Sequence, residues 1–397
     1  MSTNYELRPI NGNNPVTLVA ANHFLYYPTP KSLNYSWSFG SLAGLFFALQ
    51  IVTGIFLAMH YTPHVDLAFA SVEHIMTDVT GGYLFRYFHA NGASMIFILI
   101  YLHIGRNLYY QSYVTRPVLW NTGIVIFLLM MATAFIGYVL PWGQMSFWGA
   151  TVITSLVTAV PVVGEAIAHW VWGGFSISNA TLVRFYALHF TLPFIVLGII
   201  AGHLVALHTS GSSDPLSLPT TPGKITFHPY FTLKDTFIFF VVFAFFAALV
   251  CFAPNLLGHS DNFIPANPLV TPAHIVPEWY FTPFYAILRA CPNKLGGALG
   301  MFAAILLLLA VPTITTSTSP DALIVSTIQS TPHRIGVWIF GAVFLTLMYL
   351  GMRPAEAPYV VASKIFTFLY FSYFLLYVPT LTWLSRQLLN SVISTRR

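Results

Sequence analysis

Residues 84–106 read LFRYFHANGASMIFILIYLHIGR. Between Arg86 and Arg106 this run has no charged side chain, and as a helix it can cross the roughly 30 Å hydrocarbon core of a bilayer. His89 and His103 lie inside it. Ionisable side chains are costly inside a membrane and usually serve a function there. The stretch therefore predicts a membrane-spanning helix with two functional histidines.

The whole chain has the same apolar character. Of its 397 residues 56% are hydrophobic and 7% are charged, whereas a soluble domain carries roughly 25% charged residues. This composition excludes a soluble globular protein. The apolar runs predict an all-α, polytopic membrane protein with eight transmembrane helices, near residues 34–59, 84–106, 117–139, 181–207, 234–253, 296–313, 334–351 and 362–384.

The distribution of charge predicts the orientation of the chain. Eight spans put both termini on one side, and that side carries ten of the sixteen Lys and Arg residues: Arg8, Lys31, Arg106, Arg116, Lys224, Lys234, Arg334, Arg386, Arg396 and Arg397. The positive-inside rule places this side in the cytoplasm or the matrix. The net charge of +5 reflects few acidic residues rather than basic clusters, so no nucleic-acid partner is indicated. On the opposite face, tryptophans in the connections 140–180 and 254–292 predict segments that lie at the membrane interface.

A second pair of histidines repeats the spacing of the first. His89 and His103 in the second span, and His189 and His203 in the fourth, are each 14 positions apart. This spacing is about 40° short of four helical turns, so both members share one face, about 21 Å apart along the axis. The two spans run parallel, so His89 meets His189 and His103 meets His203. Because two imidazoles saturate a haem iron, the pattern predicts that the first four spans form a bundle with two stacked, electron-carrying haems.

Glycines repeat the same interval in the two other spans of this bundle. Gly40 and Gly54 lie in the first span, and Gly123 and Gly137 lie in the third. Glycine lacks a β-carbon, so a flat macrocycle can approach the helix backbone closely. The alternative is structural: glycines are common packing residues in membrane helices, and a membrane histidine can simply hydrogen-bond a neighbouring helix.

Two further observations concern how such haems would be held. The two cysteines, Cys251 and Cys291, cannot form a Cys-x-x-Cys-His attachment, so the haems would be non-covalent. Haem propionates are anionic and should seek Arg86, Arg106 and Arg184, which lie near predicted ligands. Each arginine could equally anchor its span at the interface.

Five motifs identify a family: RYFHANGAS (86–94), GYVLPWGQMSFWGA (137–150), WGGF (172–175), FHPY (227–230) and PEWY (277–280). With these motifs the chain resembles, over nearly its whole length, cytochrome b of the respiratory cytochrome bc complex, complex III, of the mitochondrial type. The unsplit chain and the histidine spacing of the fourth span favour the respiratory over the photosynthetic form. We expect an N-terminal di-haem four-helix bundle over 1–212, with interfacial helices near 140–180, and a C-terminal four-helix region over 213–397.

The resemblance implies a subunit of quinol–cytochrome-c reductase. It implies a low-potential b haem on His89 and His189 and a high-potential one on His103 and His203. Ubiquinol would be oxidised on the positive side and ubiquinone reduced on the negative side, coupled to proton translocation. The implied partners are a Rieske iron–sulfur subunit, a cytochrome c1 subunit and other complex III subunits, in a dimeric complex. The implied location is the mitochondrial inner membrane with the termini in the matrix; the bacterial plasma membrane is the alternative.

Glu278 is the candidate proton acceptor for quinol. It is a carboxylate beside an aromatic residue in a proline-bounded loop at the membrane surface, and partial burial there would raise its pKa toward neutrality. The resemblance places Glu278 in the quinol-oxidation site, whose pocket would be shaped by Phe135, Tyr138, Gly149, Pro277 and Tyr285. The alternative is that Glu278 anchors its loop through Arg289.

On the opposite face, His208 lies five positions past a predicted ligand, and Lys234 and Asp235 open the fifth span. Such a group can supply the two protons needed to reduce a quinone. The resemblance names His208 and Asp235 as the quinone-reduction site and adds Ser212 and Lys234 to its lining. Asp235 could instead be a helix N-terminal charge favoured by the dipole. The chain departs from the residues common in the family at Thr209, Ser210 and Asp214.

Two other functions fit parts of the pattern. A secondary transporter also uses buried histidines and broken helices, but the histidine pairs occur only in the first half of the chain, whereas transporters usually have paired halves. A structural haem anchor that binds no quinone is the second alternative. The PEWY loop and the pair His208 and Asp235 argue against it.

Overall fold

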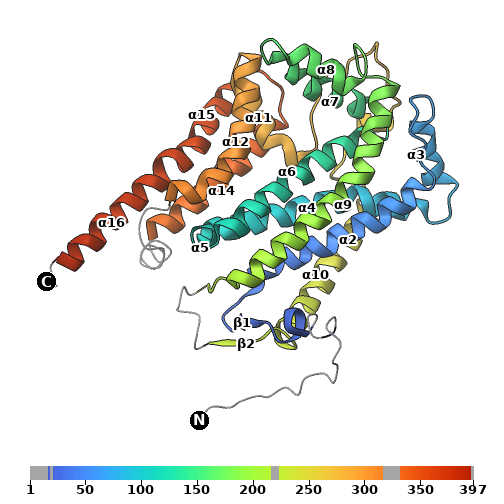
Figure 1. The fold of residues 1–397 in the computed structure, drawn as a ribbon. Coiled ribbons are helices and arrows are strands. Elements are labelled where there is room, and N and C mark those ends of the chain that lie inside the picture. Colours follow the sequence, from blue (N-terminus) through green and yellow to red (C-terminus); the bar gives the residue numbers. More distant parts are fainter. Residues whose placement is uncertain (1–16, 18–20, 216–222, 316–330, 395–397) are drawn as a thin grey trace.

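The computed structural model describes residues 17, 21–215, 223–315 and 331–394, and helices dominate these ranges (Figure 1). The eight predicted spans are confirmed within a few residues, as Tyr35–Ala58, Gly82–Tyr109, Pro117–Val139, Asn179–Ser210, Tyr230–Phe252, Lys294–Thr315, Thr331–Gly351 and Tyr359–Leu388. Of the cations counted toward the terminal side, Arg8, Arg396 and Arg397 lie outside the described residues.

Each span corresponds to a labelled helix in Figure 1. In chain order they are α2 (Phe39–Ala58, preceded by the turn η2, Tyr35–Ser38), α4 (Gly82–Tyr109), α6 (Pro117–Val139), α9 (Asn179–Ser210), α10 (Tyr230–Phe252), α12 (Lys294–Thr315), α14 (Thr331–Gly351), and α15 (Tyr359–Ser372), which continues through η6 (Tyr373–Tyr377) into α16 (Val378–Ser394). Between α4 and α6 lies the single turn α5 (Ser112–Thr115).

The first four spans form two closely packed helix pairs, α2 with α4 and α6 with α9. Local sequence explains where two of these helices begin. Pro117 opens α6, at a position where the missing N–H costs no hydrogen bond. A capping box between Ser178 and Thr181 opens α9. Pro193 lies inside α9 without ending it, as predicted for a membrane helix whose neighbours satisfy the freed backbone groups.

The C-terminal spans are joined to the first four through a short buried helix. This helix, α11 (Thr282–Ala290), packs against α12, α14 and α15. The turn before it, η5 (Trp279–Phe281), contacts α4, where the ring of Tyr280 stacks on that of Phe97 with centroids 4.1 Å apart. The same hydrophobic core therefore extends through both halves of the chain.

Short helices cover one end of the bundle (Figure 1). They are α3 (Ala68–Thr77), α7 (Gln144–Ser155), η3 (Leu156–Ala159) and α8 (Gly164–Trp172). The last three occupy the segment 140–180 in which interfacial helices are predicted. The other long connection has little regular structure before η5 apart from the turn η4 (Ser260–Phe263). It is tied to α7 because Asn262 Oδ1 accepts hydrogen bonds from the backbone N–H and the hydroxyl of Ser146.

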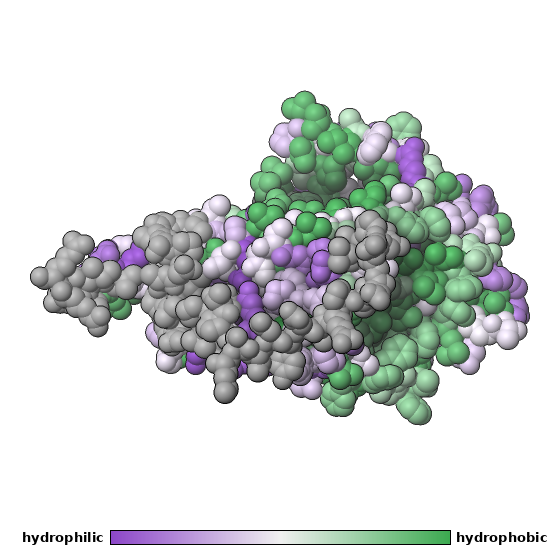
Figure 2. Space-filling view, turned by 60° about the horizontal axis from the view of Figure 1, so that its bottom comes forward, coloured by the Kyte–Doolittle hydropathy of each residue, from purple (hydrophilic) through white to green (hydrophobic). Residues whose placement is uncertain are grey.

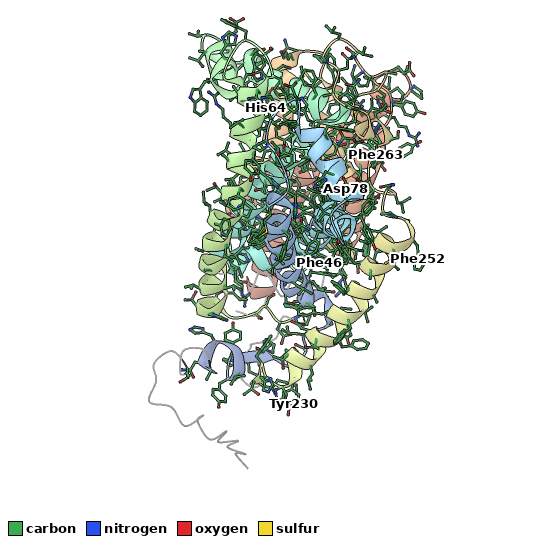
Figure 3. All side chains as sticks on the ribbon, turned by 90° about the vertical axis from the view of Figure 1, so that its right-hand side faces the viewer. Phe46, His64, Asp78, Tyr230, Phe252 and Phe263 are labelled. Carbon is green, nitrogen blue, oxygen red and sulfur yellow. The ribbon has the colours of Figure 1, made fainter. Side chains whose placement is uncertain are left out.

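The opposite end holds a small sheet that the sequence does not predict. Strand β1 (Pro28–Pro30) pairs antiparallel with β2 (Lys224–Thr226), with Thr29 opposite Ile225. The turn η1 (Ala21–Leu25) precedes β1. Figure 3 shows η1 at the end of the molecule where α10 begins, marked by Tyr230. Strands of three residues, two of them prolines in β1, carry no periodicity that sequence analysis can detect.

The surface of the spans is strongly apolar. Large apolar side chains are exposed along α10 in particular, among them Leu233, Phe237, Phe240, Phe245 and Phe252. Figure 2 shows such apolar surface, in green, over much of the visible flank. Exposure on this scale is what a helix bundle surrounded by lipid requires.

Candidate functional site

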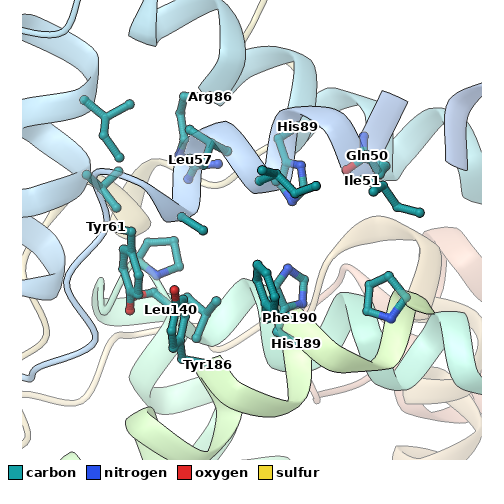
Figure 4. A pocket seen from close by; sticks show the side chains of 18 of the residues that line it. Gln50, Ile51, Leu57, Tyr61, Arg86, His89, Leu140, Tyr186, His189 and Phe190 are labelled. Atoms are coloured by element: carbon teal, nitrogen blue, oxygen red, sulfur yellow. The ribbon is translucent and has the colours of Figure 1, made fainter. Parts of the chain in front are cut away.

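Two histidines face each other between the two helix pairs. His89 extends from α4 and His189 from α9, with ring centres 6.1 Å apart and ring planes at 84° (Figure 4). A bond from an imidazole nitrogen to a transition metal is about 2 Å long, so two rings that share one ion have centres roughly 6 Å apart. The observed separation matches this requirement, and the pairing is the one that parallel spans predict.

Hydrogen bonds fix which nitrogen of each ring is free. His189 Nδ1 lies 2.9 Å from the backbone oxygen of Thr133, which only accepts, so Nδ1 carries the proton. His89 Nδ1 lies 2.9 Å from the hydroxyl of Thr53, and this hydroxyl donates to the carbonyl of Leu49 at 2.7 Å. Thr53 must therefore accept from His89. Both rings keep an unprotonated Nε2, the form in which imidazole binds a metal.

The second pair of histidines repeats part of this arrangement. His203 Nδ1 lies 2.9 Å from the hydroxyl of Thr122, which itself donates to the carbonyl of Val118 at 3.0 Å. The Thr122 hydroxyl thus accepts a hydrogen bond from His203 Nδ1, as the Thr53 hydroxyl does from His89 Nδ1. His103 differs, because its Nδ1 accepts a long hydrogen bond of 3.3 Å from the guanidinium of Arg106. His203 is an electrostatic neighbour of His103.

Each of the four repeated glycines lies against one of the four histidines. The pairs are Gly40 with His103, Gly54 with His89, Gly123 with His203 and Gly137 with His189. A β-carbon at Gly137 would lie 2.3 Å from a carbon of the His189 ring, and the same atom at the other three would lie 3.0 to 3.2 Å from the ring. The glycines therefore make room for the imidazoles, a role that the sequence prediction of macrocycle contact did not include.

A cavity surrounds the first histidine pair. Gly54 and Gly137 line it together with Arg86, and most of its other walls are apolar. Figure 4 shows His89 and His189 entering it from opposite sides. The cavity suits a mainly apolar molecule.

The donor set also favours an ion that brings its own ring of ligands. Within the described ranges no group of three or more His, Cys, Asp or Glu side chains could hold a metal. A bare ion usually needs three or four protein ligands. Two histidines per site fit an iron whose other four positions are filled by a porphyrin.

The three predicted propionate partners lie in different surroundings. Arg86 lines the cavity of the first pair. Arg106 lies over the ring of Trp37, 4.9 Å from its centre, beside His103. Arg184 instead donates a hydrogen bond of 2.6 Å to the backbone oxygen of Trp170 in α8, so its side chain is engaged at the bundle's end.

Glu278 lines a second, larger cavity, which shares His89 and His189 with the first. Burial raises the pKa of Glu278 to about 7, and a hydrogen bond with Tyr138 and the charge of Arg86 oppose this rise. The carboxyl therefore exchanges a proton near neutral pH, as the sequence predicts for a half-buried loop carboxylate.

The alternative role of Glu278 is not supported, because Arg289 binds elsewhere. Its guanidinium donates to the backbone oxygens of Arg353 at 2.7 Å and Leu350 at 2.8 Å, and lies over the ring of Tyr285. The loop is anchored instead by Trp279, whose Nε1 donates to the hydroxyl of Ser94 in α4 at 3.0 Å.

Of the predicted pocket residues, Tyr138 lines this cavity with Glu278, whereas Phe135, Gly149, Pro277 and Tyr285 are not among its lining residues. Tyr285 donates to the backbone oxygen of Ile275 at 3.3 Å, and Phe135 packs edge-on against Phe185. Gly149 faces open space, since a β-carbon there meets no atom within 4 Å. Pro277 directly precedes Glu278. Sequence reasoning missed Asn262 and His259, which line the Glu278 cavity and come from a loop with no recognisable motif.

At the opposite end, each predicted quinone residue has its own partners. The carboxylate of Asp235 accepts hydrogen bonds from Ser38 at 2.7 Å and Ser41 at 2.8 Å. The interpretation of Asp235 as a helix N-terminal charge is wrong, because α10 begins at Tyr230 and its first turn holds no acidic residue. Lys234 donates to the backbone oxygens of Leu33 and Asn34. His208 pairs with His23, and Ser212 is a hydrogen-bond neighbour of Tyr27.

The fold and the paired histidines define the class: a multi-pass membrane protein built around buried, metal-competent imidazoles. The family model described as cytochrome b/b6/petB matches residues 24–211, and that of the cytochrome b C-terminal/b6/petD region matches residues 265–371. The chain belongs to the cytochrome b family, the membrane electron-transfer subunits of complex III, a family that binds haem b. This membership excludes the transporter alternative.

Named relatives and a solved structure agree with the family. The chain is 58% identical to cytochrome b of the bacterium Rickettsia prowazekii (strain Madrid E), covering 90% of this chain and 89% of the relative. It is 54% identical to cytochrome b of the plant Solanum tuberosum, covering 95% of both. A chain of a hyperthermophilic respiratory complex III superposes with a TM-score of 0.86 at 32% identity, covering 94% of this chain and 98% of that one.

Proposed function

We propose that the chain is the di-haem subunit that oxidises quinol at a Glu278 site and reduces quinone at a His208 and Asp235 site on the opposite face. Quinol oxidation on the positive side would release protons there, and quinone reduction on the negative side would take protons up. The segment that leads into α11, which carries Glu278, and the end of α9 beside β1 and β2, which carries His208, lie at opposite ends of the described bundle (Figure 1). This separation supports a reaction that moves charge across the membrane.

Four histidines would hold the two haems, His89 with His189 and His103 with His203. The free Nε2 atoms of His89, His189 and His203, the glycine beside each ring and the apolar cavity all fit this group. When bound, the haems supply one-electron transfer across the lipid, from the low-potential site near Glu278 to the high-potential site near Arg106. Arg86, which lines the cavity, and Arg106, beside His103, would bind the propionates.

At the oxidation site, the carboxyl of Glu278 accepts a proton from quinol. Its pKa of about 7 suits this step, because an ionised fraction is present near neutral pH while the protonated form remains stable. The hydroxyl of Tyr138 holds the carboxyl in place by a hydrogen bond. Phe135, Gly149, Pro277 and Tyr285 would shape the pocket beside it.

At the reduction site, His208 and Asp235 supply protons to quinone oxygens. Asp235 is held by two serine hydroxyls, and the preceding residue, Lys234, donates to the backbone oxygen of Leu33. Lys234 and Ser212 would help to line the site. The substrate pair would be ubiquinol and ubiquinone. The two cysteines of the chain cannot hold an iron–sulfur cluster, so a Rieske subunit would take the other electron, with a cytochrome c1 subunit as further partner in a dimeric complex. A mitochondrial inner membrane, with matrix termini, is the proposed location.

The 6.1 Å approach of His89 and His189 with free Nε2 atoms carries this proposal. A reduced-minus-oxidised optical spectrum of the purified complex tests it. We expect two b haems per chain in the wild type and one in His89→Ala and in His203→Ala, while His74→Ala, an exposed histidine on α3, keeps both. Two haems in either ligand variant would overturn the assignment. Quinol-dependent haem reduction that survives Glu278→Gln combined with His208→Ala would overturn the quinone sites.

A further inference from the structure

A second histidine contacts the proposed proton donor of the quinone-reduction site. His23 in η1 lies beside His208 near the end of α9, with their Nδ1 atoms 3.0 Å apart and ring centres 4.6 Å apart. One of the two nitrogens must carry the proton that the other accepts. His23 is exposed and His208 is partly buried, so the pair extends from the surface into the site.

The position of His23 is fixed by its surroundings. The backbone N–H of Tyr26 donates to the carbonyl of Ala21 at 2.9 Å, which closes η1. The N–H of His228 donates to the carbonyl of Leu25 at 3.1 Å and that of Phe227 to Tyr27 at 2.9 Å, which extends the β1–β2 pairing next to His23.

A tyrosine contacts the same imidazole. The ring of Tyr27 meets that of His208 edge-on at 4.6 Å, and its hydroxyl donates to the carbonyl of Leu207 at 3.2 Å. His208 therefore contacts both His23 and Tyr27. Both residues come from the same N-terminal segment, which lies more than 180 positions away in sequence.

This geometry commits Nδ1 of His208 to His23, whichever ring donates. Nε2 is then the one nitrogen of His208 left for a substrate oxygen. When His208 is protonated, its Nδ1–H donates to His23 and its Nε2–H remains for the substrate. Orientation of a catalytic imidazole through its second nitrogen is a general device for proton transfer.

We infer that His23 is a positioning residue for quinone reduction: it orients His208 so that the Nε2 proton of the latter points toward a quinone oxygen. The inference rests on the proposed function. In each transfer the Nε2–H bond of protonated His208 breaks and an O–H bond of the forming quinol is made, as the quinone gains an electron. His208 becomes neutral with its Nδ1 proton still on the bond to His23, and a proton from water restores Nε2–H. Two such transfers and two electrons convert the quinone to quinol.

The test measures electron exchange between added quinol or quinone and the b haems through this site alone, in the intact complex carrying Glu278→Gln. We expect His23→Ala to lower kcat about 10-fold with little change in KM, a part of the roughly 10²- to 10⁴-fold that general acid catalysis contributes. His23→Gln, whose amide oxygen can accept the Nδ1 proton, should recover much of the rate. Added imidazole should rescue His23→Ala and leave wild type unchanged.

Optical spectra must show both b haems in each variant, and His74→Ala serves as the exposed-histidine control. A His23→Ala rate within twofold of wild type overturns the inference. So does a loss that neither His23→Gln nor imidazole restores, since this would mark a purely structural contact. His208→Ala distinguishes failure of the inferred role of His23 from failure of the proposed reduction site. If His208→Ala abolishes electron exchange while His23→Ala does not change it, only the role of His23 is contradicted. If His208→Ala keeps the rate, the proposed reduction site fails together with the inference.

Discussion

At the scale of single residues, neighbouring groups prepare His89, His189 and His203 for metal binding. Thr53 and Thr122 each donate to a carbonyl of their own helix and so are left to accept from a histidine on another helix. A threonine in a membrane helix commonly bonds its own backbone, and here that bond decides the tautomer of the facing imidazole. The metal-binding nitrogen is thereby chosen before any metal binds.

Replacing Thr53 should test this preparation directly. Thr53→Val keeps the shape but removes the acceptor for His89 Nδ1, whereas Thr53→Ser keeps the hydroxyl. Loss of such an outer-shell partner typically lowers metal affinity by about 10- to 100-fold. We expect Thr53→Val to lose haem from the His89 site to a haem-scavenging protein faster than Thr53→Ser does. An optical titration measures this loss. Equal haem loss from both variants would contradict the tautomer argument.

The pKa of Glu278 makes a prediction about pH. A raised carboxyl pKa of about 7 means that the proton-accepting, ionised form grows as the pH rises through 7 and is lost as it falls below. Quinol oxidation should therefore increase up to about one pH unit above 7 and then level off. In Glu278→Gln this rise of the rate with pH should disappear, and kcat should fall at least about 10²-fold.

The matching measurement is a pH profile of quinol-dependent cytochrome c reduction at saturating quinol. Tyr138→Phe is the informative companion variant, because it removes the hydrogen bond that lowers the pKa of Glu278. In this variant the rise of the rate should occur at higher pH. An unchanged profile in Glu278→Gln would assign the titration to another group.

At the scale of helices, close packing between spans depends on the repeated glycines. The pair α6 and α9 brings Gly137 so near His189 that a β-carbon would lie 2.3 Å from the ring, which is closer than real contacts allow. The imidazole cannot retreat freely, because its Nδ1 is held by the backbone of α6 at Thr133.

The Gly137→Ala substitution should therefore displace His189, so that the protein binds one b haem fewer. It should also weaken the packing of α6 on α9. Gly44→Ala is the matched control, since a β-carbon on that α2 glycine meets no atom within 4 Å. The haem content of purified protein, read from the reduced optical spectrum, distinguishes the two. A full complement of two haems in Gly137→Ala would show that the ring finds another position.

At the scale of the whole molecule, the first histidine cavity lies between two helix pairs that each pack well internally. Ligands that bind only the folded state stabilise it by mass action, by about 4 kcal/mol at a concentration 1,000 times Kd. Haem held by one histidine from each pair would therefore join α2 and α4 to α6 and α9 as well as carry electrons.

Protein produced under haem depletion should keep most of its helix content but unfold at lower temperature. Circular dichroism in detergent measures both quantities, and reconstitution with haem should restore the transition. The cavity that holds His89 and His189 is lined by the first four spans and their adjoining loops. We therefore expect haem depletion to destabilise these spans more than the C-terminal ones. Identical melting with and without haem would contradict a structural role for the group.

Some features of this protein follow from its sequence alone, because they depend on patterns within one segment. The eight spans are set by runs of apolar residues, and the shared face of His89 and His103 is set by helical periodicity. The spacing of four glycines and the family motifs are likewise local. The division into regions 1–212 and 213–397 stays a prediction.

Only the tertiary structure decided which of these groups meet. The contact of each glycine with an imidazole, the buried surroundings that raise the pKa of Glu278, and the partners of Asp235 arise from segments far apart in the chain. His23 and His208 are 185 positions apart, and they meet beside a sheet of two three-residue strands. Helical period is encoded residue by residue, whereas such contacts depend on how whole helices pack and on where the short connections return the chain.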